Sequence, residues 1–223
     1  QTPDEWGLKF RELLASENLD PASIDAIMVS SVVPPLETSL SSMARRYFRH
    51  DPVFVTGHTE TGLNILYENP REVGADRIVN AVAALHKYGG PCIVVDLGTA
   101  ITFDAVSARS EYLGGIICPG IGISISGLFT KTARLPMVDF REPEKLIVTN
   151  TVGSSQSGIY YGAIGMIDGI LERMILDMGG NVKTVATGGQ ASLITRGSRF
   201  VTTADDDLTL EGLRLIWERN HPQ

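Results

Sequence analysis

The fold of this chain is decided by the stretch Ile93-Val-Val-Asp-Leu-Gly-Thr-Ala-Ile-Thr-Phe-Asp-Ala-Val106. A run of β-branched residues leads into an acid and a Gly-Thr pair, and a second apolar run follows. This pattern predicts a strand, a tight turn and a second strand. Four polar or small residues lie at or beside the turn, namely Asp96, Gly98, Thr99 and Thr102. An ordinary hairpin would need no more than this, so a functional interpretation depends on the rest of the chain.

The residue types at this turn suit a nucleotide phosphate and its cation. Gly98 has no Cβ, so backbone N–H groups near it can approach an anion closely. The hydroxyls of Thr99 and Thr102 are hydrogen-bond donors, and the carboxylate of Asp96 is a hard oxygen ligand for a cation. The turn is therefore a candidate nucleotide site.

Composition and charge exclude several classes of protein. The 223 residues carry 19 basic and 26 acidic side chains, a net charge of −7, with no basic cluster. A nucleic-acid partner therefore has little support. No apolar run reaches the roughly 18 residues of a membrane helix, and no signal peptide is recognisable. Cys92 and Cys118 lie in apolar runs and are expected to be reduced thiols, which favours a cytoplasmic protein.

Helical and strand patterns alternate along the chain. A capping box at 2–5 opens a first helix, and the β-branched run 26–33 predicts a buried strand. A second helix, a short strand at 53–55 and a long loop at 56–73 follow. The remaining patterns predict a third strand at 112–118, helices from 121 and over 155–178, strands at 182–187 and 199–203, and a last helix with Leu210, Leu213 and Trp217 inward. The alternation favours an α/β fold.

Asp76 and Arg77 fall in the first turn of the helix that ends at Gly89-Gly90. Aspartate there is favoured by the helix dipole, whereas arginine is not. Arg77 therefore calls for another explanation. A salt bridge to a neighbouring acid is one, and a bound ligand carrying a carboxylate is the other, because arginine binds carboxylates in a bidentate way.

The longest predicted helix carries a stripe of glycines at Gly158, Gly162, Gly165 and Gly169. Each glycine costs about 0.8–1 kcal/mol of helix propensity relative to alanine. Close approach of another backbone would explain the stripe, either within the chain or across a dimer.

The turn at 96–99 and a strand followed by Ala186-Thr-Gly-Gly189 together resemble the actin-like ATPase superfamily, which includes sugar kinases. More specifically, the chain resembles the type III pantothenate kinases. The matching segments run in order along the whole chain: 30–35 (SSVVPP), 61–65 (TGLNI), 67–70 (YENP), 73–78 (VGADRI), 96–100 (DLGTA), 114–116 (GGI) with 119–120 (PG), 135–136 (LP), 150–151 (NT), 156–158 (QSG) and 186–189 (ATGG). Each segment is a weak signal alone, but their order and spacing are specific.

The resemblance implies phosphorylation of pantothenate by ATP, the first step of coenzyme A biosynthesis. It implies that Asp76 is the catalytic base and that Asp96 is a ligand of a potassium or ammonium ion. It further implies two sets of binding residues: Tyr67, Gly74, Ala75, Asp76, Arg77 and Thr151 for pantothenate, and Gly98, Thr99, Thr102, Gly188 and Gly189 for ATP. Thr151 would come from the neighbouring subunit, so a homodimer with the substrate pocket at its interface is expected.

The implied fold has two actin-like, ribonuclease H-like domains with mixed sheets flanked by helices. We place the first at 1–88 and the second at 89–223. The family's first phosphate loop, with its magnesium contacts, has no counterpart in these 223 residues, so the first domain is expected to be incomplete at its N-terminus. Hence an alternative stays open, a non-catalytic relative acting as a regulatory or accessory protein. Magnesium is expected as the companion of ATP.

Overall fold

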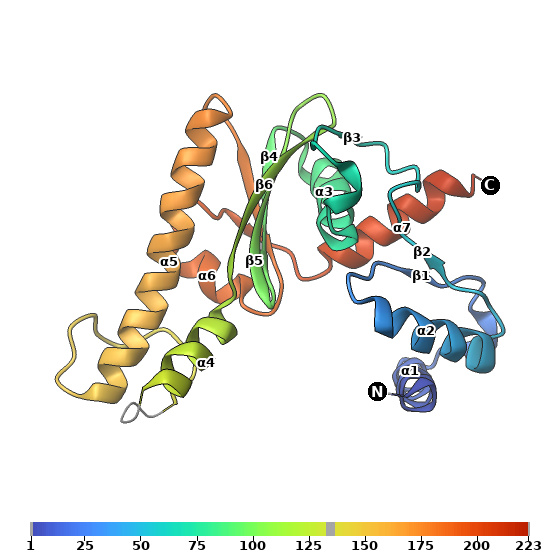
Figure 1. Cartoon of the computed structure of the whole chain (residues 1–223), viewed down its shortest axis with the longest axis horizontal. Helices are drawn as coiled ribbons and strands as arrows, with labels where there is room; N and C mark the ends of the chain where they lie inside the picture. The colour runs from blue at the N-terminus through green and yellow to red at the C-terminus, as the bar shows by residue number, and fades with distance from the viewer. Residues whose placement is uncertain (1, 133–136, 223) are drawn as a thin grey trace.

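A computed structural model describes residues 2–132 and 137–222. Its centre is a six-stranded mixed sheet in the order β3-β6-β5-β4-β7-β8 (Figure 1). The strands are β3 (Asn64–Ile65), β4 (Cys92–Leu97), β5 (Ala100–Val106), β6 (Glu111–Pro119), β7 (Lys183–Thr187) and β8 (Thr203–Ala204). Strand β5 is antiparallel to β4 and β6, whereas β4–β7, β7–β8 and β3–β6 are parallel pairs. The predicted mixed-sheet α/β fold is confirmed, and β6-β5-β4-β7-β8 has the ribonuclease H-like order.

The predicted hairpin at 93–106 is the pair β4–β5. Asp96 stands opposite Thr102 in the register, and the Gly98 N–H donates to the Ala100 carbonyl at 3.1 Å. Alternation along β4 divides the core between two layers. Ile93, Val95 and Leu97 face one cluster, whereas Cys92 and Val94 face the other.

Helices cover both faces of the sheet (Figure 1). Helices α5 (Thr151–Asp177) and α6 (Ala191–Gly197) lie on one face, with α4 (Ile121–Lys131) following β6. Helices α3 (Ala75–Tyr88) and α7 (Leu208–Asn220) lie on the other. The long helix therefore begins four residues earlier than predicted, where the Asn150 side chain accepts a hydrogen bond from the Gly153 N–H at 2.8 Å and caps it.

The N-terminal part packs beside α3 and α7. It contains α1 (Pro3–Ser16), β1 (Met28–Val29), α2 (Pro34–Met43), β2 (Val53–Phe54) and short helical turns at Pro21–Ser23, Ala44–Phe48 and Pro70–Glu72. The capping box of α1 is confirmed. The long buried strand expected at 26–33 is wrong. Only Met28 and Val29 pair, with β2, and Val32 is 56% exposed.

Two further expectations, both near the C-terminus, need correction. The last short strand is at 203–204 and not at 199–203. Leu210 is exposed, and α7 instead buries Leu208, Gly212 and Ile216. The two sides of the predicted domain boundary at 88/89 are packed together: β3, before it, pairs with β6, and α3, also before it, packs against α7. The division at 88/89 stays a prediction.

Candidate active site

The predicted nucleotide and cation residues meet at the end of β4. Asp96 Oδ1 faces the turns at Gly98 and Gly188. A Cβ built on Gly98 would lie 3.6 Å from this oxygen, and one on Gly188 would lie 3.0 Å from it. Gly188 also has φ +92°, a backbone conformation that favours glycine. Two turns without side chains therefore flank one carboxylate oxygen.

The other oxygen of Asp96 is held from α3. The Asn80 side-chain Nδ2 donates to Asp96 Oδ2 at 3.0 Å. Burial raises the pKa of Asp96 to about 6, and the negative charge of Asp76 adds to this shift, while the Asn80 hydrogen bond opposes it. Asp76 lies one helical turn before Asn80 on α3, so the predicted base and the predicted cation ligand lie on neighbouring elements.

Asp76 lies in the first turn of α3. The Arg77 backbone N–H donates to Asp76 Oδ1 at 2.8 Å, and a Cβ on Gly74 would lie 2.5 Å from the same oxygen. Gly74 and Ala75 line a cavity of about 250 Å³ that also contains Ser31 and Val32. Two of the predicted substrate residues, Gly74 and Ala75, therefore border an open volume, and Asp76 follows them in the chain.

Arg77 is buried and forms an ion pair with Asp104, so the salt-bridge explanation is confirmed. Its Nε donates to Asp104 Oδ1 at 2.7 Å. Burial raises the pKa of Asp104, and Arg77, Tyr112 and Thr102 oppose that rise. Nη2 of Arg77 lies 2.7 Å from the same oxygen but makes no hydrogen bond to any described residue. Both nitrogens therefore face one carboxylate oxygen, and Nη2 is itself buried from solvent.

Tyr67 and Thr102 border this ion pair. The ring of Tyr67 packs against Tyr112 with centroids 6.4 Å apart, and Tyr112 Oη donates to Asp104 at 2.6 Å. The Thr102 hydroxyl, predicted to contact ATP, donates to Asp104 Oδ2 at 3.0 Å. The hydroxyl proton of Thr102 is therefore donated to Asp104 and not to a ligand.

A second cavity, of about 360 Å³, joins the two glycine turns. Gly98 and Gly189 line it together with Ile101, Ile121 and Phe140. Thr99 is exposed at the tip of the β4–β5 turn. An apolar volume beside glycine turns has the composition expected for a nucleoside.

Thr151 is separated from these residues within one chain. It begins α5 and lines an open cavity formed by 148–151 and 154–155, which contains none of the other predicted site residues. Figure 1 places this end of α5 beside α4, away from α3.

No group of three His, Cys, Asp or Glu side chains within 2–132 and 137–222 could hold a metal ion. Asp96 nevertheless fits a monovalent cation, since its Oδ1 accepts no hydrogen bond from these residues and lies beside two backbone turns. No described helix is long and apolar enough to cross a membrane.

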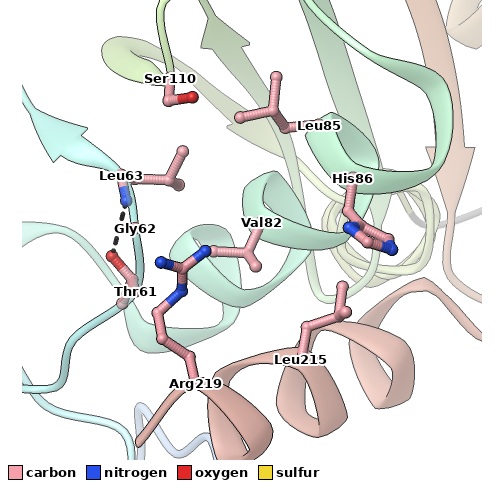
Figure 2. Close-up of a pocket in the computed structure, with 9 residues that line it drawn as sticks. All are labelled: Thr61, Gly62, Leu63, Val82, Leu85, His86, Ser110, Leu215 and Arg219. Carbon is pink, nitrogen blue, oxygen red and sulfur yellow. Dashed lines mark hydrogen bonds between the residues drawn. The ribbon is translucent and has the colours of Figure 1, made fainter.

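A cavity of about 520 Å³ lies apart from this site, between α3, α7 and the segment 61–63 (Figure 2). His86 and Arg219 border it, with Val82, Leu85 and Leu215 between them. None of the predicted site residues lines it.

The sheet order and the flanking helices define an actin-like α/β fold, and the glycine turns around Asp96 define a candidate nucleotide site on it. The chain belongs to the type III pantothenate kinase family, whose model matches residues 1–173. A type III pantothenate kinase of Solibacter usitatus is 60% identical over 223 residues, covering 100% of this chain and 85% of that protein. One of Koribacter versatilis is 60% identical over 220 residues, covering 99% and 80%.

A solved structure of a Baf family protein from Campylobacter jejuni, described as a transcriptional activator, has the same fold. The TM-score is 0.58 at 22% identity, covering 89% of this chain and 84% of that one. At this identity, the likeness shows the fold alone.

Sequence reasoning missed three residues of the site. Asp104 is an acid inside an apolar strand, and Asn80 is an amide inside an apolar helical pattern; both are fully buried. Thr209 donates to Asn80 at 2.7 Å across 129 residues of sequence. A buried polar residue needs a hydrogen-bond partner. A polar residue inside an apolar pattern therefore marked Asp104 and Asn80 as candidates, whereas nothing in the sequence marked Thr209.

Proposed function

We propose that this protein transfers the γ-phosphoryl group of ATP to the hydroxyl of pantothenate, the first step of coenzyme A biosynthesis. The observation that carries the proposal is the placement of Asp96 between the turns of Gly98 and Gly188, within electrostatic reach of Asp76. Phosphoryl transfer depends mainly on positioning and charge neutralisation. A phosphate-compatible turn beside a carboxylate base offers both.

In this reaction the pantothenate hydroxyl oxygen attacks the γ-phosphorus while its proton passes to the carboxylate of Asp76, and ADP leaves. Tyr67, Gly74, Ala75 and Arg77 bind pantothenate. Asp104 holds the buried guanidinium of Arg77 in one position beside Tyr112, whose ring packs against Tyr67. Thr151 would complete the pocket from a partner subunit.

ATP binds along the glycine turns, with Gly98 and Thr99 toward the phosphates and Gly188 and Gly189 toward the nucleoside. For Thr102 to bind a phosphate as well, its hydroxyl would turn away from Asp104. Asp96 holds a potassium or ammonium ion, which offsets phosphate charge when bound. Magnesium enters with ATP, since it is commonly held by substrate phosphates and water with few protein ligands.

The test is ADP release that depends on both pantothenate and potassium, compared between the wild type and Asp76→Asn. Loss of a general base is expected to lower kcat by about 10²–10⁴-fold, while pantothenate binding, followed by calorimetry, stays within a few-fold. Asp51→Asn, an exposed acid paired with Arg45, is the matched control.

Unchanged turnover of Asp76→Asn would remove Asp76 from the role of base. No pantothenate-dependent turnover in the wild type would favour the alternative, a non-catalytic accessory protein.

We also propose a homodimer. The intrachain explanation of the glycine stripe is wrong for Gly158, Gly162 and Gly165, because a Cβ on any of them would meet no described atom within 4 Å. Across a dimer, the open stripe would admit a second helix, and the separate position of Thr151 supports a pocket completed by a partner. The cytoplasmic location remains a prediction.

A further inference from the structure

Asp96 is reached by a short chain of side-chain hydrogen bonds that starts on the last helix. The Thr209 hydroxyl, in the first turn of α7, donates to Asn80 Oδ1 at 2.7 Å. The Asn80 Nδ2 then donates to Asp96 Oδ2 at 3.0 Å. Asn80 is fully buried, so its amide has no solvent with which to exchange these bonds.

The two hydrogen bonds are compatible with one orientation of the Asn80 amide. An asparagine amide can present either its oxygen or its nitrogen to a neighbour. A carboxylate can only accept, so the ionised Asp96 selects the orientation in which the Asn80 nitrogen faces it. The Asn80 oxygen then faces Thr209, whose hydroxyl can donate or accept and here donates.

The two carboxylate oxygens of Asp96 therefore have different surroundings. Oδ2 is fastened to α3, and Oδ1 accepts no hydrogen bond from the described residues and lies beside the Gly98 and Gly188 turns. Holding Oδ2 restricts rotation of the carboxylate about χ2, so Oδ1 keeps one position.

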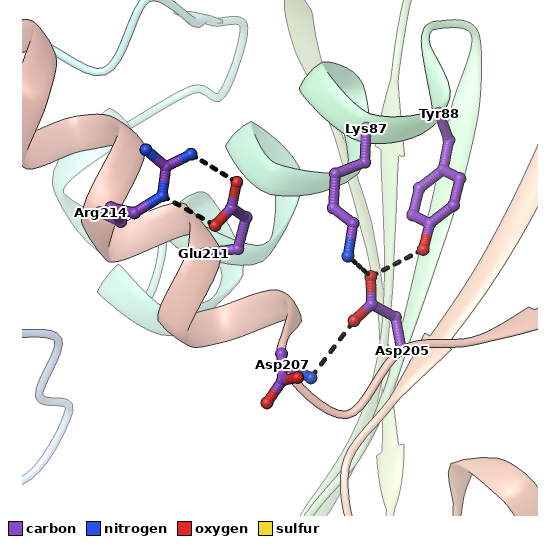
Figure 3. A network of polar contacts seen from close by, with 6 residues as sticks. All are labelled: Lys87, Tyr88, Asp205, Asp207, Glu211 and Arg214. Carbon is purple, nitrogen blue, oxygen red and sulfur yellow. Dashed lines mark hydrogen bonds and ion pairs between the residues drawn. The ribbon is translucent and has the colours of Figure 1, made fainter.

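The packing of α7 on α3 makes the chain of bonds possible. A Cβ on Gly212, one helical turn after Thr209, would clash with the carbonyl oxygen of Val79, beside Asn80. The two helices therefore approach at backbone distance where Thr209 meets Asn80. At the far end of α3, Lys87 and Tyr88 bind Asp205, which precedes α7 (Figure 3).

We propose that Thr209 and Asn80 are positioning residues for the cation-binding carboxylate, holding Asp96 Oδ2 so that Oδ1 stays directed at the two glycine turns. This inference rests on the proposed role of Asp96 in binding a monovalent cation. It extends that site to α7, a helix that follows the last glycine turn and contributes none of the predicted site residues.

The test is the potassium dependence of Thr209→Val, which removes the hydroxyl but keeps the shape of the side chain. The half-saturating potassium concentration is expected to rise roughly fivefold to thirtyfold, the effect of losing one partly buried hydrogen bond. Thr209→Ser, which keeps the hydroxyl, should restore most of the wild-type value. Thr195→Val is the matched control, since its hydroxyl also lies on a helix, half-buried, and donates at 2.8 Å to Ala191.

A second readout needs no turnover. Adding potassium chloride in place of an equal concentration of sodium chloride should raise the Tm of the wild type, because a ligand that binds only the folded state stabilises it. This rise should shrink in Thr209→Val and persist in Thr195→Val. A general loss of stability in Thr209→Val would lower Tm equally in both salts.

Asp96→Asn separates failure of the inference from failure of the proposed cation site. If Asp96→Asn keeps full potassium activation, Asp96 is not the cation ligand and the proposed site is wrong. If Asp96→Asn loses activation while Thr209→Val matches the wild type in both readouts, the cation site stands and the positioning role is overturned.

Discussion

Arg77 is held inside the protein by a single carboxylate, and this contact shapes the substrate side of the site. Asp104 is fully buried in β5 and accepts hydrogen bonds from Arg77, Tyr112 and Thr102. A carboxylate that is desolvated but charged needs all of these donors. Asp104 therefore fixes the guanidinium that we propose binds pantothenate.

At this scale we predict that Asp104→Asn lowers the free energy of unfolding by about 3 kcal/mol, because it leaves the buried guanidinium without an opposite charge. Urea unfolding at pH 7 measures the change. Asp51→Asn, which breaks the exposed pair with Arg45, should cost less than about 1 kcal/mol. Equal effects of the two substitutions would contradict the structural role assigned to Asp104.

Among the elements, α3 and α7 pack against each other and carry both a site contact and a structural contact. Asn80 meets Thr209 near the sheet, and Lys87 and Tyr88 meet Asp205 at the opposite end of α3 (Figure 3). The acidic run 205–207 immediately precedes α7. Asp205 is buried, while Asp206 is exposed.

The Asp205 contact predicts a pH dependence of stability. Burial alone would raise the pKa of Asp205, but hydrogen bonds from Lys87 and Tyr88 outweigh it and lower the pKa below 3.8. A lowered folded-state pKa stabilises the protein above the unfolded pKa, and this contribution is lost as the pH falls through the folded value. Asp205→Asn should therefore cost about 1–2 kcal/mol at pH 7.

That deficit should begin to shrink as the pH falls below about 4, the unfolded-state pKa, and should vanish as the pH falls through the lower folded-state pKa, where wild-type Asp205 becomes protonated. Denaturant unfolding of both proteins between pH 7 and pH 3 measures it. Asp206→Asn is the matched control and should be nearly neutral throughout. A deficit that does not change with pH would mean that the charge of Asp205 is not what stabilises this end of α3.

For the whole molecule, the open glycine stripe on α5 is the feature that a single chain leaves unexplained. We predict that Gly162→Leu weakens dimerisation, because a large side chain would keep a second helix away from the stripe. Sedimentation at micromolar concentration should show a shift from dimer toward monomer, with pantothenate-dependent turnover falling in parallel because Thr151 of one subunit would no longer reach its partner's site.

Ala15→Leu is the control for that experiment, since Ala15 is an exposed small residue on α1. It should leave the dimer intact. A wild-type protein that is monomeric at this concentration would overturn the dimer proposal outright.

Local chemistry in the sequence determined the central hairpin, the start of α3 and the alternation of helices and strands. A β-branched run, a Gly-Thr turn and a second apolar run specify strand, turn and strand whatever surrounds them. That Gly188 shares a site with Gly98 and Asp96 was implied by the family resemblance, not by local pattern. Parallel pairing of β4 with β7 places the ends of those two strands together.

Strand length and polar pairing were decided by tertiary structure. The apolar run 26–33 reads as a long strand, but β2 pairs with only two of its residues. The partner of Arg77 lies 27 residues away and the partner of Asn80 lies 129 residues away. A local pattern shows that a buried charge or amide needs a partner, but only the folded chain brings that partner within 3 Å, because packing between distant elements determines which groups meet.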